Sequence, residues 1–466
     1  MQSDYDVIVI GAGPAGMSGA IAARAHGLSV LLVDEQAAPG GQIWRKVEQN
    51  AGISVGHALG ADYLKGARLV AGLRESGADV CFGAQVWQIE EGFHVYLSHD
   101  GKARCLKARA VLLATGAQER PSPFPGWTLP GVMTVGAAQI LIKTSGAIPE
   151  EPAWIAGSGP LPLLYMSQLL DLGGEVAGYI DTSPRRNFWR AARFFPGALR
   201  ASGSMIKGLK WLSRLKRAGV PVFSAARGLE ALGDQRLETI RFEKANGEGF
   251  EAPARLLLTH EGVVPNIHFS MALGCAHDWN EAQLCFAPRL DAWGESARSG
   301  VFIAGDGGGI AGADAAAAFG EIAGLGIACK LGALTQEATA AQAGRARKAL
   351  KPLLAIRPFL DALYRPRAEI FSPRPDTLVC RCECRTADQV LQAARRGAAD
   401  PNQVKAAIRA GMGPCQGRQC GYSVAALVAE AHGLPMGSVG FFNIRPPLKP
   451  VTLGEVAALA SAEDGK

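Results

Sequence analysis

The feature that most constrains the fold of this chain is a glycine-rich turn between an apolar strand and a helix near the N-terminus. A strand is predicted over residues 6–10, a helix ends near His26, and a second strand covers residues 28–33. In such a turn the first glycine allows the sharp bend, the second lets a pyrophosphate approach the backbone, and the third permits close helix packing. The helix N-terminus then offers unpaired N–H groups and a partial positive charge to a phosphate. The pattern predicts a dinucleotide-binding βαβ unit, and its candidate phosphate contacts are Gly11, Gly13, Pro14, Ala15 and Gly16.

An acidic residue at the end of the second strand strengthens this prediction. Asp34 follows Gly16 by 18 residues, which is the position where a carboxylate accepts hydrogen bonds from a ribose hydroxyl. Glu35 is the neighbouring candidate for the same role.

Three later segments supply the other parts expected of an FAD domain. A Pro-Gly-Gly-Gln stretch follows the ribose acid, an Ala-Thr-Gly stretch follows the apolar strand at residues 110–113, and a Gly-Asp pair stands between a late strand and a small-residue helix. In this order they predict FAD, and over residues 1–330 the set resembles the two-dinucleotide-binding-domain flavoproteins. The further candidate cofactor contacts are Gly41, Gln42, Ala114, Thr115, Gly116, Gly305 and Asp306.

A second strand-turn-helix-strand unit begins near Ala153. Its turn keeps two glycines, Gly157 and Gly159, but Pro162 stands where the third would be, and proline is bulkier at a close-packing point. Asp181 and the basic pair after it would allow a nucleotide phosphate, whereas a vestigial packing fold fits equally well. NAD(P)H is therefore not predicted as the electron donor.

Five of the ten cysteines crowd into residues 380–420, and the other five are isolated. No isolated cysteine has a nearby partner, which argues against a disulfide reductase. The crowd contains a C-x-C pair and a C-x₄-C pair, a spacing unusual for zinc and compatible with two irons. Zinc and free thiols are the alternatives. The segment resembles the bacterioferritin-associated-ferredoxin-like [2Fe-2S] domain, and this resemblance implies the ligands Cys380, Cys382, Cys415 and Cys420, with Cys384 as an extra cysteine.

The predicted fold class is α/β, with two Rossmann-like domains, one inserted in the other, and a small, mainly helical C-terminal [2Fe-2S] domain. The predicted divisions are residues 1–145 and 273–345 for the two parts of the FAD domain, 146–272 for the NAD(P)-like insertion, 346–375 for a linker, 376–440 for the [2Fe-2S] domain and 441–466 for a tail.

Charge and termini limit the possible partners and location. The 48 basic and 42 acidic residues give a net charge of +6 that we take to be scattered, without a dense basic run among aromatics, so nucleic acid is not an expected partner. The N-terminus lacks the features of a signal peptide, which predicts a cytoplasmic protein. No apolar stretch is long enough to span a membrane, and any membrane association would be peripheral.

Over nearly its whole length the chain resembles the α subunit of heteromeric bacterial opine, D-hydroxyproline and related amino-acid dehydrogenases. Segments at residues 126–132, 261–266, 291–294 and 445–447 look like that family. The resemblance implies electron transfer in this chain, substrate C–N oxidation on a β subunit with its own FAD, an FMN held between subunits in some cases, and in some cases a small third subunit. No catalytic residue is predicted here, and His260 is taken as a core or loop histidine. The alternative is a self-contained NAD(P)H-dependent FAD/[2Fe-2S] oxidoreductase.

Overall fold

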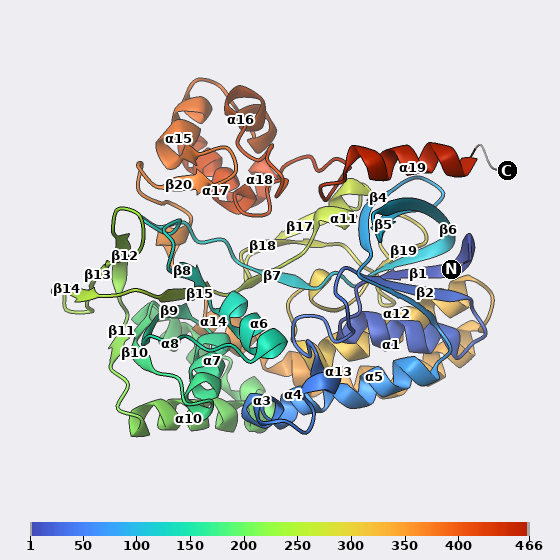
Figure 1. The fold of residues 1–466 in the computed structure, drawn as a ribbon, viewed down its shortest axis with the longest axis horizontal. Helices are drawn as coiled ribbons and strands as arrows, with labels where there is room; N and C mark the ends of the chain where they lie inside the picture. The colour runs from blue at the N-terminus through green and yellow to red at the C-terminus, as the bar shows by residue number, and fades with distance from the viewer. Residues whose placement is uncertain (1, 464–466) are drawn as a thin grey trace.

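The computed structural model describes residues 2–463, and its N-terminal part is built on a seven-stranded sheet (Figure 1). The strands of this sheet are β1 (Asp4–Ile10), β2 (Val30–Asp34), β3 (Asp79–Phe82), β4 (Gln85–Ile89), β5 (His94–His99), β6 (Lys102–Leu113) and β19 (Val301–Ile303). The order β3-β2-β1-β6-β19 is parallel throughout, while β4 and β5 extend β6 as an antiparallel meander. The apolar runs in β1 and β2 are buried, as expected for parallel strands with both faces covered.

Two helices that pack on this sheet approach each other unusually closely. The helices of the first fold are α1 (Pro14–Arg24), α2 (Val47–Asn50), α3 (Ser54–Leu59), α4 (Ala61–Leu64), α5 (Gly66–Glu75), α12 (Ala313–Lys330) and α13 (Gln336–Ala355). A Cβ atom at Gly320 of α12 would lie 2.0 Å from the carbonyl oxygen of Ala15 in α1, and one at Gly324 would lie 2.4 Å from that of Gly19. The small residues of α12 therefore set the distance between the two helices.

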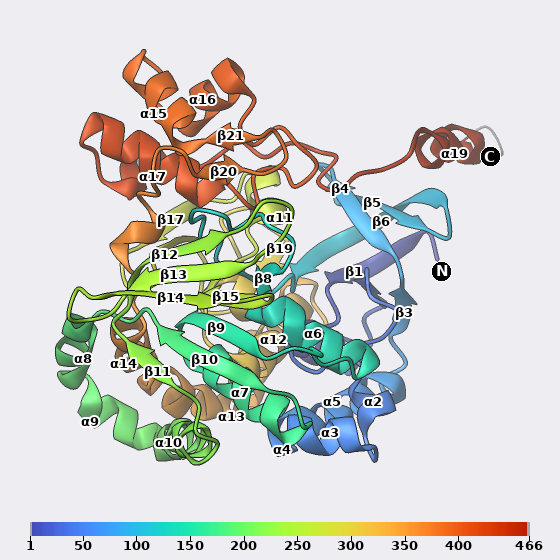
Figure 2. The same ribbon diagram turned by 60° about the vertical axis from the view of Figure 1, so that its left-hand side comes forward.

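A second parallel sheet lies beside the first (Figures 1 and 2). It has the order β11-β10-β9-β15-β8, with β8 (Val132–Thr134), β9 (Ala153–Ser158), β10 (Val176–Asp181), β11 (Val222–Ser224) and β15 (Leu257–Glu261). Its other elements are α6 (Val135–Ser145), α7 (Pro160–Asp171), α8 (Arg185–Ala192), α9 (Phe195–Ala198), η1 (Leu199–Ala201), α10 (Ser202–Arg217) and an antiparallel sheet of β12 (Arg227–Leu232), β13 (Thr239–Glu243) and β14 (Gly249–Pro253). Strand β8 lies within residues 1–145, so this sheet begins before the predicted start of the insertion at residue 146.

Two short strands connect the folds. Strand β7 (Ala117–Glu119) leads out of the first fold and β16 (Val263–Pro265) leads back, and the two pair in antiparallel fashion. After β16 come α11 (His268–Ala272), the hairpin β17 (His277–Asn280) and β18 (Cys285–Pro288), and η2 (Gly305–Gly307). Residues 346–375, predicted as a linker, contain the end of α13, all of α14 (Arg357–Leu363) and η3 (Ala368–Ile370), because Pro358 is tolerated in the first turn of α14.

The cysteine-bearing part lies above the second sheet and the β17–β18 hairpin (Figure 1). It contains β20 (Leu378–Cys380), β21 (Arg385–Thr386), α15 (Ala387–Arg395), α16 (Pro401–Ile408), α17 (Gly421–His432) and α18 (Met436–Val439). Thr386 and Gln389 form a capping box at α15, and Asp400 caps α16, whose first residue is Pro401. Residues 441–452 have neither helix nor strand, and α19 (Leu453–Glu463) follows. Within residues 2–463, no helix has the length and apolar character needed to cross a bilayer.

Candidate functional site

The predicted phosphate-binding turn and the loop that follows the ribose acid lie against each other. The backbone N–H of Gly40 donates to the carbonyl of Ala12 at 2.9 Å, and a Cβ at Gly41 would lie 2.8 Å from the Cα of Gly13. Gly13 itself is different, because the nearest atom to a Cβ there is 3.9 Å away. The N-terminus of α1 has no side-chain cap. The structure thus leaves open space and free N–H groups at Gly13, which is what an approaching pyrophosphate requires.

The two acids after β2 face different partners. Asp34 accepts hydrogen bonds from the backbone N–H of Ala12 at 2.6 Å and of Gln36 at 2.8 Å, and burial raises its pKa. Its oxygens have remaining lone pairs for a hydroxyl. Glu35 instead forms an ion pair of 2.8 Å with Lys449 in the C-terminal tail. Of the two, Asp34 is therefore the one placed at the glycine turn.

The Ala114–Gly116 segment and the Gly305-Asp306 pair complete this edge of the sheet. A Cβ at Gly11 would lie 2.4 Å from the carbonyl oxygen of Ala114, and one at Gly305 would lie 2.8 Å from the Cβ of Ala15. The Asp306 carboxylate accepts from the backbone N–H groups of Ala311 and Gly312 just before α12, at 2.8 and 3.0 Å. All four predicted segments are thus brought together around the uncapped N-termini of α1 and α12.

A buried lysine, which the sequence analysis missed, holds the same loop from the second fold. Lys143 of α6 donates to the carbonyl of Gln42 at 3.0 Å and to the Gln139 amide oxygen at 2.8 Å. The Gln139 amide donates to Gln168 of α7 at 2.8 Å, and Gln168 donates to the carbonyl of Leu59 at 3.0 Å. This chain of amides fixes the cofactor loop against the inserted fold. Burial lowers the pKa of Lys143 to about 7.

The lowered pKa of Lys143 predicts a pH-dependent contribution to stability. Because the unfolded lysine keeps its ordinary pKa of about 10.4, the unfolded state binds more protons between pH 7 and 10, and stability should rise with pH over that interval. The thermal midpoint of Lys143→Met should exceed that of the natural protein most at pH 6, and the excess should shrink toward pH 9. Lys46→Met is the matched control, since Lys46 is exposed and nearby. Equal excesses at both pH values would contradict the prediction.

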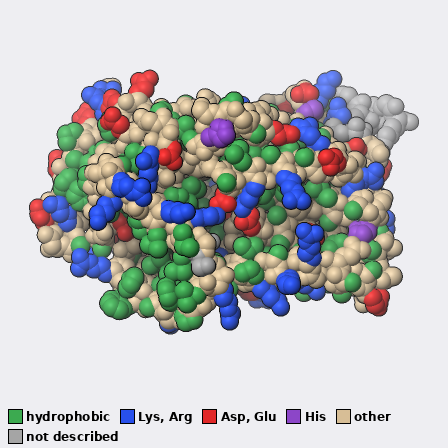
Figure 3. Space-filling view, turned by 90° about the horizontal axis from the view of Figure 1, so that it is seen from below, with side chains coloured by type: hydrophobic (Ala, Val, Ile, Leu, Met, Phe, Trp, Pro, Cys, Tyr) green, Lys and Arg blue, Asp and Glu red, His purple; other side chains and the backbone are tan. Residues whose placement is uncertain are grey.

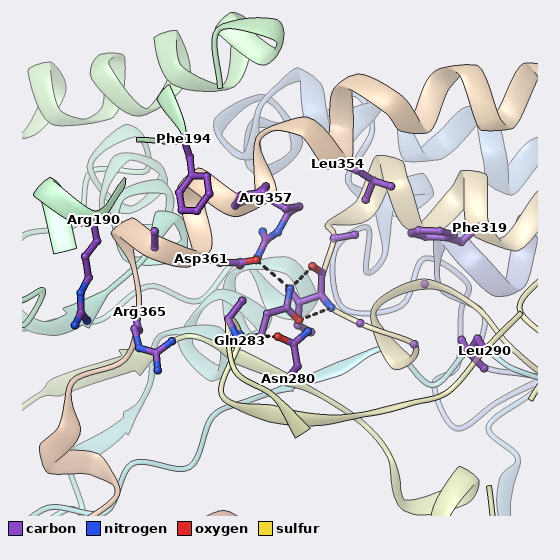
Figure 4. A pocket seen from close by; sticks show the side chains of 18 of the residues that line it. Arg190, Phe194, Asn280, Gln283, Leu290, Phe319, Leu354, Arg357, Asp361 and Arg365 are labelled. Atoms are coloured by element: carbon purple, nitrogen blue, oxygen red, sulfur yellow. Dashed lines mark hydrogen bonds and ion pairs between the residues drawn. The ribbon is translucent and has the colours of Figure 1, made fainter. Parts of the chain in front are cut away.

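A cavity of about 840 Å³ adjoins the Gly305 segment (Figure 4). Arg190 of α8 and Arg365 lie at one end, and Leu290, Phe319 and Leu354 at the other. Its floor is a hydrogen-bonded group drawn in Figure 4, in which the Gln283 side chain donates to the carbonyl of Ile310 and accepts from its N–H. The cavity has the size of a small-molecule site, with a basic end and an apolar end.

The four predicted cluster ligands come together as two pairs of thiols. Cys380 and Cys420 hydrogen-bond to each other, and so do Cys382 and Cys415. The bond with Cys420 lowers the pKa of Cys380 to about 6; the same bond and burial raise that of Cys420, and burial raises that of Cys415. Across the part of the chain that the structure describes, no three His, Cys, Asp or Glu side chains converge closely enough to hold a metal ion.

Cys384 lies outside these pairs. Its sulfur is exposed and contacts the carbonyl of Arg381 at 3.9 Å. The strand ends at Cys380 and residues 381–384 form a turn, so Cys380 and Cys382 do not lie on one extended segment. A Cβ at Gly413 would lie 2.2 Å from the Cβ of Cys382, so glycine at 413 lets the two loops approach.

The cysteine loop rests on strand β7, which leaves the flavin-type fold, and on helix α11. Gln118 of β7, two residues after Gly116, donates to the carbonyl of Arg418 at 3.0 Å. At the start of α11, His268 bonds through Nε2 to the carbonyl of Gln416 at 3.0 Å, and burial lowers its pKa to about 3. These contacts could not be found from sequence, since no motif marks either residue. They place the Cys415–Cys420 loop against β7, the strand that directly follows Thr115 and Gly116, and against α11.

The matching edge of the second sheet is filled by the chain's own residues. Arg367, from the segment after α14, forms a buried ion pair of 2.8 Å with Glu261 at the end of β15. Thr182, which follows β10, donates to the same carboxylate at 3.1 Å. His260 is buried and bonded to Glu119 at 2.7 Å, which agrees with a structural role. This edge therefore differs from the open turn at Gly13.

Comparison with known proteins agrees with this geometry. Residues 5–320 match the pyridine nucleotide-disulphide oxidoreductase family, and residues 377–460 match the sarcosine oxidase A3 domain. The chain is 43% identical to the opine oxidase A subunit of Rhizobium meliloti (98% of this chain, 99% of the relative). It is 40% identical to the corresponding opine oxidase chain of Agrobacterium tumefaciens (98% and 92%) and 32% identical to hydrogen cyanide synthase subunit HcnB of Pseudomonas aeruginosa (95% and 96%). Among solved structures, L-proline dehydrogenase from P. horikoshii shares the fold, with a TM-score of 0.72 at 20% identity over 97% of this chain and 79% of that one.

The fold and the glycine turn define an oxidoreductase with an FAD-type dinucleotide-binding domain and a second Rossmann fold inserted in it. The chain belongs to the pyridine nucleotide-disulphide oxidoreductase family and, within it, to the family of the opine oxidase A subunits. The resemblance to the opine oxidase subunits is thereby confirmed at the level of the family, and FAD is supported as the cofactor of the first fold, whereas the [2Fe-2S] domain stays a prediction.

Proposed function

We propose that this chain is the electron-transfer α subunit of a heteromeric flavin-dependent dehydrogenase that acts on C–N bonds. The observation that carries the proposal is the contact of the cysteine loop with strand β7, which leaves the FAD segments, through Gln118, and with helix α11, through His268. Electrons accepted at one redox group would have a short, packed route to the other. The sarcosine oxidase and opine oxidase relatives are named for oxidation of amine substrates, which supports the same class of donor here.

The residues present fit FAD. Gly11, Gly13 and Gly16 would face the pyrophosphate together with Pro14 and Ala15, since the space beside Gly13 is open and α1 is uncapped. Asp34 would accept from the ribose, while Glu35 is engaged by Lys449. When bound, FAD would supply two-electron and one-electron transfer. The remaining proposed contacts, on the loop and strand ends around it, are Gly41, Gln42, Ala114, Thr115, Gly116, Gly305 and Asp306.

The two thiol pairs fit a [2Fe-2S] cluster by their chemistry, because thiolates hold this cluster type. The hydrogen bond that lowers the pKa of Cys380 already favours thiolate in one of them. We propose Cys380, Cys382, Cys415 and Cys420 as the ligands and exclude Cys384, which is exposed and turned to Arg381. Zinc remains the alternative metal.

The cavity of Figure 4 is the proposed place for a flavin ring beside Gly305. Its apolar end suits an isoalloxazine, and Arg190 and Arg365 suit a phosphate. Two sources share this chemistry: the flavin half of FAD, or an FMN at the boundary with a β subunit. If FMN occupied the cavity, each αβ pair would contain FAD on this chain and FMN in the cavity, in addition to the FAD of the β subunit.

The proposed division of labour predicts where substrate turnover resides. The purified chain alone should reduce no dye with an opine or with D-hydroxyproline, whereas the complex with a β subunit should, because the family resemblance places the substrate-oxidising flavin on that β subunit. Dye-linked assays of the single chain, of the reconstituted complex and of the β subunit make this comparison. Turnover by the pure single chain, with no partner detectable, would refute the assignment of this chain as one subunit of a complex.

The filled edge of the second sheet gives a separate expectation. NADH and NADPH should not bleach the flavin, since a buried ion pair of Arg367 with Glu261 lies at the strand end beside the second glycine turn, where Glu261 pairs with Ser158. Anaerobic titration followed at the flavin absorption band tests this. Stoichiometric bleaching would favour the self-contained NAD(P)H-dependent oxidoreductase instead.

A further inference from the structure

The positive charge of the chain is concentrated in one segment of the second Rossmann fold. Residues 182–229 contain eleven Lys and Arg residues and no Asp or Glu. The rest of the chain contains 37 basic against 42 acidic residues, so the net charge of +6 arises from this segment alone. The scattered charge assumed from the totals is therefore wrong.

This segment also exposes large apolar side chains. It forms α8, α9, η1 and α10, which follow one another down the left and lower edge of the molecule in Figure 2, with α10 at the bottom in Figure 1. Trp189 is 76% exposed and Leu209 is 65% exposed, although side chains of this kind are usually covered. Its exposed apolar residues include Phe188, Trp189, Leu199, Ile206, Leu209 and Leu212.

Helix α10 carries cations among these apolar residues. Its buried side is anchored by Leu215, while Ile206 and Leu209 point outward together with Lys210 and Lys216. Lys210 and Lys216 form no ion pair within residues 2–463. Figure 3, which views the molecule from below, shows hydrophobic side chains gathered with Lys and Arg on the half of this face where α10 lies. We call α8 to α10 the basic apolar surface.

We propose that the basic apolar surface binds the surface of a membrane rich in anionic lipid. Helices of this composition lie in the interface, with Trp, Phe and Leu at the acyl boundary and Lys and Arg at the headgroups. Long cationic side chains can extend around the apolar ones to reach lipid phosphates. Since no described helix is suited to span a bilayer, the contact would be peripheral.

Other occupants fit the surface less well. The centres of protein–protein interfaces are depleted in lysine, whereas here Lys210 stands beside Leu209. A nucleic acid would use the cations and stack on the aromatic rings, but it would leave Leu199, Ile206 and Leu212 exposed. An anionic membrane matches both the charge and the aliphatic residues.

The test is co-sedimentation of the full purified protein with vesicles. One set contains phosphatidylglycerol and phosphatidylcholine, and the other contains phosphatidylcholine alone. Lys210→Glu/Lys216→Glu replaces two positive charges of α10 by negative ones. Ile206→Ser/Leu209→Ser removes exposed apolar area from the same helix. Lys102→Glu/Lys107→Glu, on exposed positions of β6, is the matched control for charge.

Binding to the anionic vesicles alone, lost in both α10 variants and kept in the β6 control, is the expected result. Partitioning of the charge variant should fall by roughly thirtyfold or more, since each lysine near an anionic surface is worth on the order of 1 kcal/mol. Absence of vesicle binding, or equal binding by all variants, would overturn the proposal. The proposal would also be overturned if the natural protein did not bind vesicles but did bind a partner subunit or a single-stranded oligonucleotide, and if the α10 variants lost that binding.

Discussion

Gly13→Val should empty the FAD site and leave the fold intact. Gly13 has an ordinary φ of −77°, and a Cβ there would meet nothing nearer than the Cα of Gly41 at 3.9 Å. The protein can therefore accept the side chain, but the pyrophosphate cannot, because the valine occupies its approach to the backbone. Flavin released per chain should fall to roughly a tenth or less of the natural content, while the far-ultraviolet circular dichroism stays unchanged.

Two other glycines serve as controls for this result. Gly344→Val adds the same side chain to α13, where a Cβ would have open space, and it should keep the flavin. Gly16→Ala should instead damage the fold, since its Cβ would lie 1.8 Å from the carbonyl oxygen of Gly11. Full flavin content in Gly13→Val would show that the pyrophosphate does not lie at this turn.

Cys382→Ser should abolish most of the visible iron–sulfur absorbance, and Cys384→Ser should keep it. Cys382 hydrogen-bonds with Cys415, whereas the Cys384 sulfur contacts only the carbonyl of Arg381 among the partners the structure gives it. Serine replaces a thiolate that the cluster requires. Absorbance and iron content per chain measure the effect, and replacement of Cys380, Cys415 or Cys420 should act as Cys382→Ser does.

The opposite pattern would be informative. If Cys384→Ser loses the cluster while Cys380→Ser or Cys382→Ser keeps it, the ligand set is wrong by one residue. Zinc in place of iron in the natural protein would remove the cluster from the proposal, although the packing of the cysteine loop on Gln118 would be unaffected.

The parts of the fold that the sequence predicts well are those specified by local patterns. Strand β1 is an unbroken apolar run before a glycine turn, and Thr386 and Asp400 are helix caps, so each is specified by neighbours in the chain. The four FAD segments were found for the same reason, because each is a short motif at a strand end.

Contacts between distant segments could not be predicted in this way. The pairing of Lys143 with Gln42 joins residues 101 positions apart, and that of Arg367 with Glu261 joins residues 106 positions apart. The helices within residues 346–375 were also missed, because Pro352 inside α13 and Pro358 in the first turn of α14 resemble linker signals. The basic segment at residues 182–229 could be found from the sequence, but only by counting charged residues segment by segment and not over the whole chain.

The packing of the cysteine-bearing part has a consequence for how the chain can be divided. One continuous apolar cluster includes Val264 and Phe286 of the first fold together with Val379, Tyr422 and Phe441. Lys449 and Leu448 of the tail then bind back to Glu35 and to the carbonyl of Trp87. The C-terminal part is therefore not a detachable module: a cut near residue 375 would expose apolar surface on both fragments, and neither could be transplanted to another protein as a self-sufficient unit.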